Sequence, residues 1–167
     1  MDTKLIAIDA GWGGAVAWWI KSKDRLGLRD CPGDYTGIVA LLSRLTKRYG
    51  SDGWEAVIEA NTPSPKFGAR GNFGLGLNVG AWCTAFAAFS IPVVDINPKM
   101  WQKMTVNIKS RKKKGREARK EKAWRYARQC FPKFREQLGD DVPHPRRPEQ
   151  GRADALCILD WGRKWRT

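Results

Sequence analysis

Three acidic residues lie next to apolar runs in the sequence. A charged carboxylate is unfavourable in such surroundings, so each of these positions requires an explanation. Asp9 follows one short apolar run, Glu59 ends another, and Asp154 comes just before a third. A carboxylate among buried apolar residues is costly unless it is hydrogen-bonded, neutralised or bound to a cation. For Asp9, a hydrogen bond to the backbone of the following glycine turn is a local alternative. The meaning of these acids therefore depends on whether the fold brings them together.

Acids that do converge favour one kind of chemistry. Carboxylates a few Å apart cannot all ionise cheaply, and hard divalent cations relieve this repulsion. Mg²⁺ held by few carboxylates and several waters suits phosphate substrates, and two such ions about 4 Å apart can activate a water and stabilise the leaving oxygen. The pattern gives the hypothesis of a metal-dependent nuclease.

The charge of the chain agrees with a nucleic-acid partner. Its 167 residues have a formal net charge of +14, and the basic excess is concentrated in the second half. Such a balance attracts polyanions, of which nucleic acid is the commonest. The run from 109 to 122 is densely basic. We expect a segment of about residues 107–120 to be mobile when free and ordered on nucleic acid.

Several other classes are disfavoured by composition. The four cysteines lie far apart without a CxxC pair, which argues against a zinc site or a disulfide framework, and the single histidine, His144, argues against charge-relay hydrolysis. No glycine pattern matches a nucleotide-binding loop in its required context, so no nucleotide cofactor is expected. Without a signal-like or membrane-length apolar run, we expect a protein of the cytoplasm or nucleoid, neither secreted nor membrane-bound.

The surrounding elements predict a single α/β domain over residues 1–167. Residues 5–8 and 15–20 predict an antiparallel hairpin, and a third strand ends at residue 30. Further buried strands are predicted at 54–59 and 91–96. Helices are predicted over 35–49, 75–89, 98–104, 117–131 and 151–164. Residues 61–76 predict a surface loop. This order is typical of a mixed sheet, beginning with the hairpin, with helices on both faces.

Five segments, in order, carry a family resemblance. They are IAIDAGWGGAVAW, VIEANTPSP, FGLGLNVGAWCTAFAAFSIPVVDINPKMWQKM, KEKAWRYARQCFP and GRADALCILDWG. Together they resemble the RuvC-type Holliday junction resolvases, nearest the phage-encoded and chloroplast branches. The resemblance spans nearly the whole chain. It implies a ribonuclease H-like fold and a homodimer that makes paired nicks in opposite strands of a four-way DNA junction. It also implies Mg²⁺, with Mn²⁺ able to substitute.

The resemblance also assigns the acids. Asp9, Glu59 and Asp154 match catalytic metal ligands of the family. Asp9 would bridge two ions, and Glu59 and Asp154 would each complete one, for hydrolysis of a phosphodiester by metal-activated water. Many relatives carry a further acid three positions before the last aspartate, where this chain has Gly151. We predict Glu149 as the fourth ligand.

Two assignments have alternatives. Asp160 is the second candidate for the fourth ligand, although it lies on another face of the same predicted helix. A family lysine that contacts the scissile phosphate or its water is predicted at Lys120, with Lys122 as the alternative.

Residues 63–74 correspond to the family segment that enters the junction centre. Phe67 or Phe73 would stack on opened bases while Lys66 and Arg70 hold phosphates. The alternative is that either phenylalanine packs back on the core. The remaining predicted DNA-contacting residues are all basic: Lys109, Arg111, Lys112, Lys113, Lys114, Arg116, Lys122 and Arg152.

Three other functions compete with junction resolution. A ribonuclease H or transposase-like nuclease would share the fold. An actin-like or sugar-kinase ATPase would begin with a similar hairpin, but needs two lobes that this chain is too short to supply. A basic nucleic-acid-binding protein could lack catalysis. The dimer surface is predicted on the helix at 75–89 and the neighbouring loop.

Overall fold

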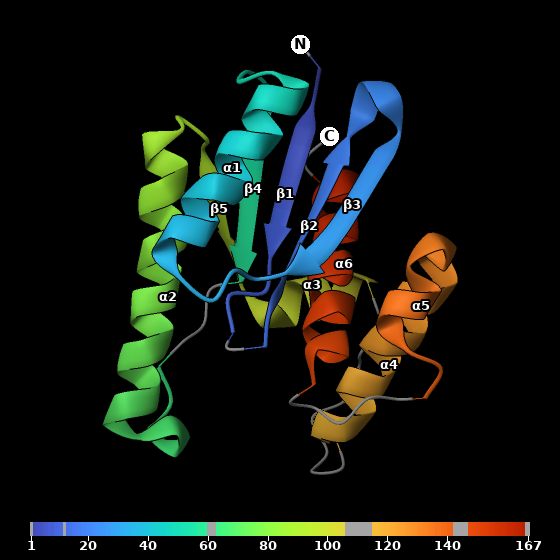
Figure 1. Ribbon diagram of the computed structural model, residues 1–167. Helices are drawn as coiled ribbons and strands as arrows, with labels where there is room; N and C mark the ends of the chain where they lie inside the picture. Colours follow the sequence, from blue (N-terminus) through green and yellow to red (C-terminus); the bar gives the residue numbers. More distant parts are fainter. Residues whose placement is uncertain (1, 12, 60–62, 106–114, 142–146, 166–167) are drawn as a thin grey trace.

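Five strands form one mixed sheet in the order β3-β2-β1-β4-β5 (Figure 1). β1 (Lys4–Ile8) and β2 (Ala15–Ile20) form the predicted antiparallel hairpin, and β3 (Arg25–Asp30) continues it. β4 (Trp54–Glu59) and β5 (Val93–Ile96) run parallel to β1. The predicted α/β class with a mixed sheet is confirmed. The computed structural model describes residues 2–11, 13–59, 63–105, 115–141 and 147–165.

Helices cover both faces of the sheet. One layer contains α1 (Tyr35–Tyr49) and α2 (Gly68–Ala88). The other contains four helices: α3 (Pro98–Thr105), α4 (Gly115–Cys130), α5 (Arg135–Leu138) and α6 (Pro148–Trp165). None of the helices in the described ranges combines the length and apolar content that a membrane span needs.

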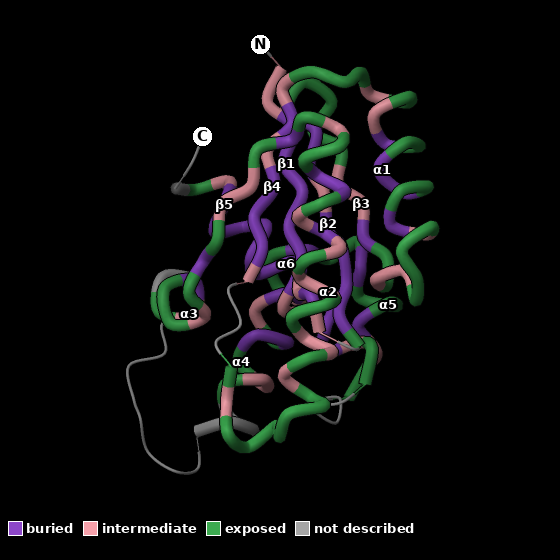
Figure 2. The backbone as a smooth tube through the Cα atoms, turned by 90° about the vertical axis from the view of Figure 1, so that its left-hand side faces the viewer, coloured by how far each residue is buried: buried purple, intermediate pink, exposed green. Residues whose placement is uncertain are grey.

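The alternation of side chains along β1 divides the core into two halves. Ile6 and Ile8 pack in the cluster that includes residues of α1 and α2. Leu5 and Ala7 pack in the cluster that includes residues of α3, α4 and α6. Figure 2 shows the buried central strands between helices whose outer faces are exposed. The sheet is therefore a rigid base for residues at its ends.

The structure differs from prediction at the start of α2. Residues 61–76 were expected to form a loop, but α2 begins at Gly68 after the 3-10 helix η2 (Pro65–Phe67). The side chain of Asn72 accepts a hydrogen bond from Ser64 N at 3.0 Å and donates one to Ser64 O at 2.9 Å. These bonds tie the helix start to the preceding chain and offset the low helix propensity of its glycines.

Two other helix starts lie earlier than expected. α6 begins at Pro148 rather than at 151, because proline is well suited to the first turn of a helix. α4 begins at Gly115, so residues 115–120 of the predicted mobile segment are helical, whereas 107–114 lie outside the described residues. The short α5 and the 3-10 helix η3 (Pro132–Phe134) were not predicted.

Candidate active site

The register of two parallel strands places the first two acids next to each other. β1 and β4 pair Ile8 with Ile58, so the residues that follow, Asp9 and Glu59, lie side by side at the carboxyl ends of these strands. Asp9 N donates to Ala15 O at 3.1 Å, which fixes Asp9 at the start of the hairpin turn. Convergence of these two acids is thus a direct consequence of strand pairing.

The third acid comes from α6, which lies against the hairpin turn. Gly14 and Gly151 form an isolated parallel β-bridge. A Cβ on Gly151 would lie 2.0 Å from Gly13 O, and a Cβ on Gly14 would lie 1.8 Å from Asp9 O. Because only glycine fits at both positions, the turn and the first turns of α6 can approach closely. Asp154, one turn along α6, thereby reaches the acids of the sheet.

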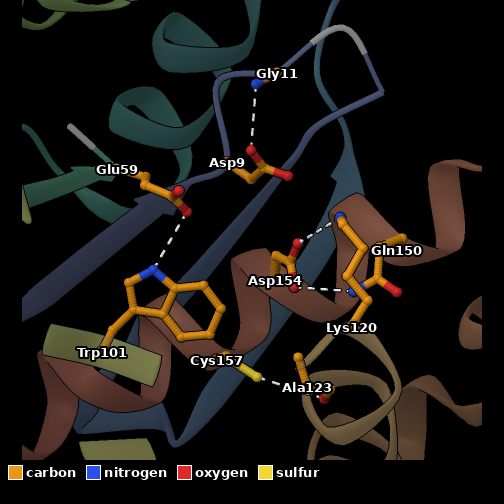
Figure 3. Close-up of polar contacts among 9 residues, drawn as sticks. All are labelled: Asp9, Gly11, Glu59, Trp101, Lys120, Ala123, Gln150, Asp154 and Cys157. Carbon is orange, nitrogen blue, oxygen red and sulfur yellow. Dashed lines mark hydrogen bonds and ion pairs between the residues drawn. The ribbon is translucent and has the colours of Figure 1, made fainter. Parts of the chain in front are cut away.

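Figure 3 shows the side chains of Asp9, Glu59 and Asp154 converging on one region. Their ionisation reflects this closeness. The pKa of Asp9 is raised to about 7 by burial and then by the charge of Asp154. The pKa of Glu59 is raised to about 8 by burial and then by the charges of Asp9 and Asp154. Burial also raises the pKa of Asp154, against the lowering effect of Lys120. The three acids therefore form one electrostatic unit.

Each carboxyl group also receives a hydrogen-bond donor. Gly11 N donates to Asp9 Oδ1 at 3.3 Å, which is the local bond considered from sequence. Trp101 Nε1 donates to Glu59 Oε2 at 3.2 Å. On Asp154, Gln150 Nε2 lies 3.0 Å from Oδ1 and Lys120 Nζ lies 3.3 Å from Oδ2. The local bond of Asp9 thus coexists with the acid cluster and does not replace it.

The structure separates the two lysine candidates. Lys120 lies on the face of α4 that meets α6, and its ion pair with Asp154 is largely shielded, with 24% and 13% of the two side chains exposed. Lys122 is exposed to solvent. Lys120 is therefore the lysine that the fold brings to the acids.

The two candidates for a fourth ligand have different surroundings. Asp160 accepts a hydrogen bond from Tyr126 OH at 2.5 Å and pairs with Lys164 Nζ at 2.7 Å, so it belongs to the contact between α4 and α6. Glu149 Oε2 is buried and has no hydrogen-bond partner within the described residues. The pKa of Arg152 is raised first by its hydrogen bond to Asp30 and to a smaller extent by the charge of Glu149. The role of Glu149 stays a prediction.

Sequence reasoning missed two residues of this site. Trp101 is buried in the core and also donates a hydrogen bond to Glu59. Gln150 lies outside the helix predicted over 151–164, whereas in the structure it is in the first turn of α6. Its spacing of four residues from Asp154 would have revealed their contact, had the helix start been predicted correctly.

The predicted junction-contacting side chains around the start of α2 are exposed. Phe67 is 52% and Phe73 69% exposed, so the alternative that they pack on the core is wrong. Lys66 and Arg70 are exposed as well. In both overall views, the start of α2 extends beyond the end of the sheet at which β1 and β4 terminate (Figures 1 and 2).

The other predicted DNA contacts have different outcomes. Arg152 is engaged within the protein: its Nε and Nη2 lie 2.6 and 2.7 Å from the two oxygens of Asp30, and Nη1 donates to Gln137 O. Arg116 lies within α4. The remaining candidates, Lys109 and 111–114, lie outside the described residues.

The acids have the chemistry that a hard divalent cation requires. They offer only oxygen atoms, they are partly buried, and their charges repel. Within the described ranges, no group of three or more His, Cys, Asp or Glu side chains is arranged to hold a single ion. An arrangement of two ions needs only two acids for each ion, with water completing the coordination. The residues present fit that arrangement.

Solved structures share this architecture. The chain matches Thermus thermophilus RuvC in complex with a Holliday junction substrate, with a TM-score of 0.55 and 14% identity over 98% of this chain and 96% of that chain. The chain has the RuvC fold. A second Thermus thermophilus RuvC structure matches with a TM-score of 0.52 and 16% identity, over 98% and 97% of the two chains.

No protein-family model matches the sequence, and no curated protein matches it. At these identities the likeness to RuvC establishes the ribonuclease H-like fold alone. The described residues form one five-stranded sheet, so they provide no second lobe of the kind that actin-like and sugar-kinase ATPases need.

Proposed function

We propose that the protein is a structure-selective DNA endonuclease that resolves four-way junctions by metal-dependent phosphodiester hydrolysis. The observation that carries this proposal is the convergence of Asp9, Glu59 and Asp154 at the end of the sheet in a RuvC-type fold. The junction substrate bound by Thermus thermophilus RuvC supports the choice of branched DNA. The net charge of +14 supports a nucleic-acid partner.

Asp9, Glu59 and Asp154 would hold two Mg²⁺ or Mn²⁺ ions, with Asp9 shared between them. When bound, such ions lower the pKa of a water and stabilise charge on the leaving oxygen. The protein positions the acids: strand pairing fixes Asp9 and Glu59, and the glycine contact of α6 fixes Asp154. Hydrogen bonds from Gly11, Trp101, Gln150 and Lys120 hold these carboxylates, which favours a ligand geometry set before substrate arrives.

Lys120 would contribute a positive charge beside the acids. Its ammonium lies on Asp154 in the free protein, and it would attract a non-bridging oxygen of the scissile phosphate when DNA enters. This role needs no proton transfer by Lys120. It requires only that the ammonium stay within reach of both groups.

Exposed aromatic residues at the start of α2 favour a junction over a continuous duplex. Bases in a continuous duplex are stacked on one another, whereas a junction centre exposes base faces to which Phe67 and Phe73 could bind. Paired nicks in opposite strands require two active sites, so we propose a homodimer, with part of α2 as its contact surface. The site of action would be the DNA of the cytoplasm or nucleoid.

The test compares wild-type protein with Asp9→Asn on a four-way junction and an RNA–DNA hybrid. Asp9→Asn keeps the side-chain size and removes a charge, so we expect loss of cleavage with junction binding largely retained. Asp140→Asn, at an exposed position, is the control for the same chemical change. Undiminished cleavage by Asp9→Asn would contradict the site. Preference for the hybrid would favour another ribonuclease H-like nuclease, and binding without metal-stimulated cleavage would favour a non-catalytic protein.

A further inference from the structure

Gln150 is almost fully buried beside the acid cluster, with 1% of its surface exposed. Its Nε2 donates to Asp154 Oδ1 at 3.0 Å, on the opposite carboxylate oxygen from Lys120 (Figure 3). The carboxylate accepts hydrogen bonds and does not donate them, so it fixes which end of the amide faces Asp154. The Oε1 atom of Gln150 therefore points elsewhere.

That second amide atom lacks a protein partner. Gln150 Oε1 is buried and has no hydrogen-bond partner in the part of the chain that the structure describes. An unmade hydrogen bond at a buried acceptor destabilises the folded protein, and such atoms in native proteins call for a specific explanation. Figure 3 shows this oxygen on the side of the amide away from Asp9 and Glu59, so the hydrogen bond from Nε2 is the contact by which Gln150 acts on the acids.

The backbone of α6 explains why the side chain that contacts Asp154 comes from residue 150. Gly151, the next residue, lies so close to Gly13 O that no side chain fits there. The first turn of α6 can therefore present a side chain to Asp154 from Gln150, but not from residue 151. An amide at this point donates a hydrogen bond to Asp154 without adding a fourth negative charge beside the three acids.

We infer that Gln150 is a positioning residue of the active site, which holds Asp154 through Nε2 in the orientation that binds a divalent cation. This inference rests on the proposed function, because it requires the acids to bind such a cation. Partners of this kind around metal-ligating side chains fix ligand orientation, and their loss weakens metal binding about 10- to 100-fold.

The test measures Mn²⁺ binding without any catalytic readout. Titration calorimetry gives the Mn²⁺ affinity, and thermal melting with EDTA or Mn²⁺ gives the rise in Tm caused by the ion. Gln150→Met keeps the approximate volume and removes both polar atoms. Gln150→Glu keeps the shape and an oxygen acceptor, but replaces the donor with a charge that repels Asp154.

We expect Gln150→Met to bind Mn²⁺ about 10- to 100-fold more weakly than wild type, with a smaller rise in Tm. We expect Gln150→Glu to melt lower than wild type in EDTA and to show a larger rise in Tm with Mn²⁺, because the ion relieves the added repulsion. Tyr126→Phe is the matched control, since it removes another donor to a carboxylate of α6, Asp160, outside the site.

Different failures have different meanings. If all variants lose Tm in EDTA but keep the wild-type Mn²⁺ affinity and the wild-type rise in Tm, Gln150 is only structural and the inference is wrong. If wild-type protein binds no Mn²⁺ and Asp9→Asn behaves identically, the proposed metal-dependent function is itself wrong, and the inference fails with it.

Discussion

Lys120 Nζ lies 3.3 Å from Asp154 Oδ2 and links α4 to α6 at the acid cluster. This ion pair counters the repulsion among the acids, because the charge of Lys120 lowers the pKa values of Asp9, Glu59 and Asp154. Among the described residues of the site, Lys120 is the positively charged side chain that could contact a phosphate.

Replacing Lys120 with Met should therefore reduce cleavage. We expect a loss on the order of 10²-fold in kcat, as is typical when one group that stabilises transition-state charge is removed. Lys122→Met makes the same chemical change at an exposed position of the same helix, and should leave kcat nearly unchanged. Single-turnover cleavage of a junction measures both. Equal losses of kcat in the two variants would show that Lys120 has no specific role in the active site.

Trp101 should orient Glu59 as well as fill the core. Trp101→Phe keeps an aromatic ring and removes the Nε1 donor that lies 3.2 Å from Glu59 Oε2, so we expect cleavage to fall by about 10-fold or more. Trp82→Phe is the control, because Trp82 is also fully buried and its Nε1 has no hydrogen-bond partner within the described residues. Cleavage rates and melting temperatures of both variants separate an effect on Glu59 from a loss of core packing. Equal loss of activity in both variants at equal loss of stability would indicate packing alone.

The acid cluster should make metal-free protein less stable as pH rises. The pKa is about 7 for Asp9 and about 8 for Glu59 in the folded protein, whereas both are near 4 in an unfolded chain. Between these limits the folded state holds more protons, so the contribution of these acids to stability falls from about pH 4 to about pH 8.

Asp9→Asn isolates this effect. In EDTA, the variant should melt close to wild type near pH 5 and a few degrees above it near pH 9, since about 1 kcal/mol corresponds to about 2–4 °C in a domain of this size. Differential scanning calorimetry across this range measures the difference. A constant difference at all pH values would contradict the raised pKa of Asp9.

Junction affinity should depend steeply on salt. Replacing Lys112, Lys113 and Lys114 with Ala should reduce the slope of log affinity against log salt by about 2 to 3 units, roughly one for each lost phosphate contact. The control replaces three exposed lysines, Lys21, Lys23 and Lys47. Lys21 and Lys23 follow Ile20, which pairs with Lys4 at the end of β1 opposite Asp9, and Lys47 lies in the last turn of α1. Fluorescence anisotropy at several salt concentrations gives both slopes. An equal reduction in the control would show that only total charge matters.

The sequence predicted the parts of the fold that local pattern determines. α1 and β4 have the expected bounds, and the hairpin forms as expected, because their apolar periodicity and turn residues agree. The three converging acids were also predicted. Their convergence depends on strand pairing and helix packing, which a linear pattern only suggests.

The features that the sequence did not predict depend on contacts formed only in the folded chain. The start of α2 was missed because the Asn72–Ser64 hydrogen bonds outweigh glycine propensity. The reason for Gly151 lies in the backbone of Gly13, which only the folded chain brings near. Gln150 could be assigned to the site only once α6 was seen to begin at Pro148, which places Gln150 one helical turn before Asp154.

Incubation of the protein with a synthetic mobile four-way junction, with and without Mg²⁺, followed by mapping of the nicks, tests the central claim most directly. We expect nicks placed symmetrically in two opposite strands, dependent on Mg²⁺, and absent with Asp9→Asn. An absence of cleavage with Mg²⁺, or nicking of an unbranched duplex as fast as the junction, would contradict the account.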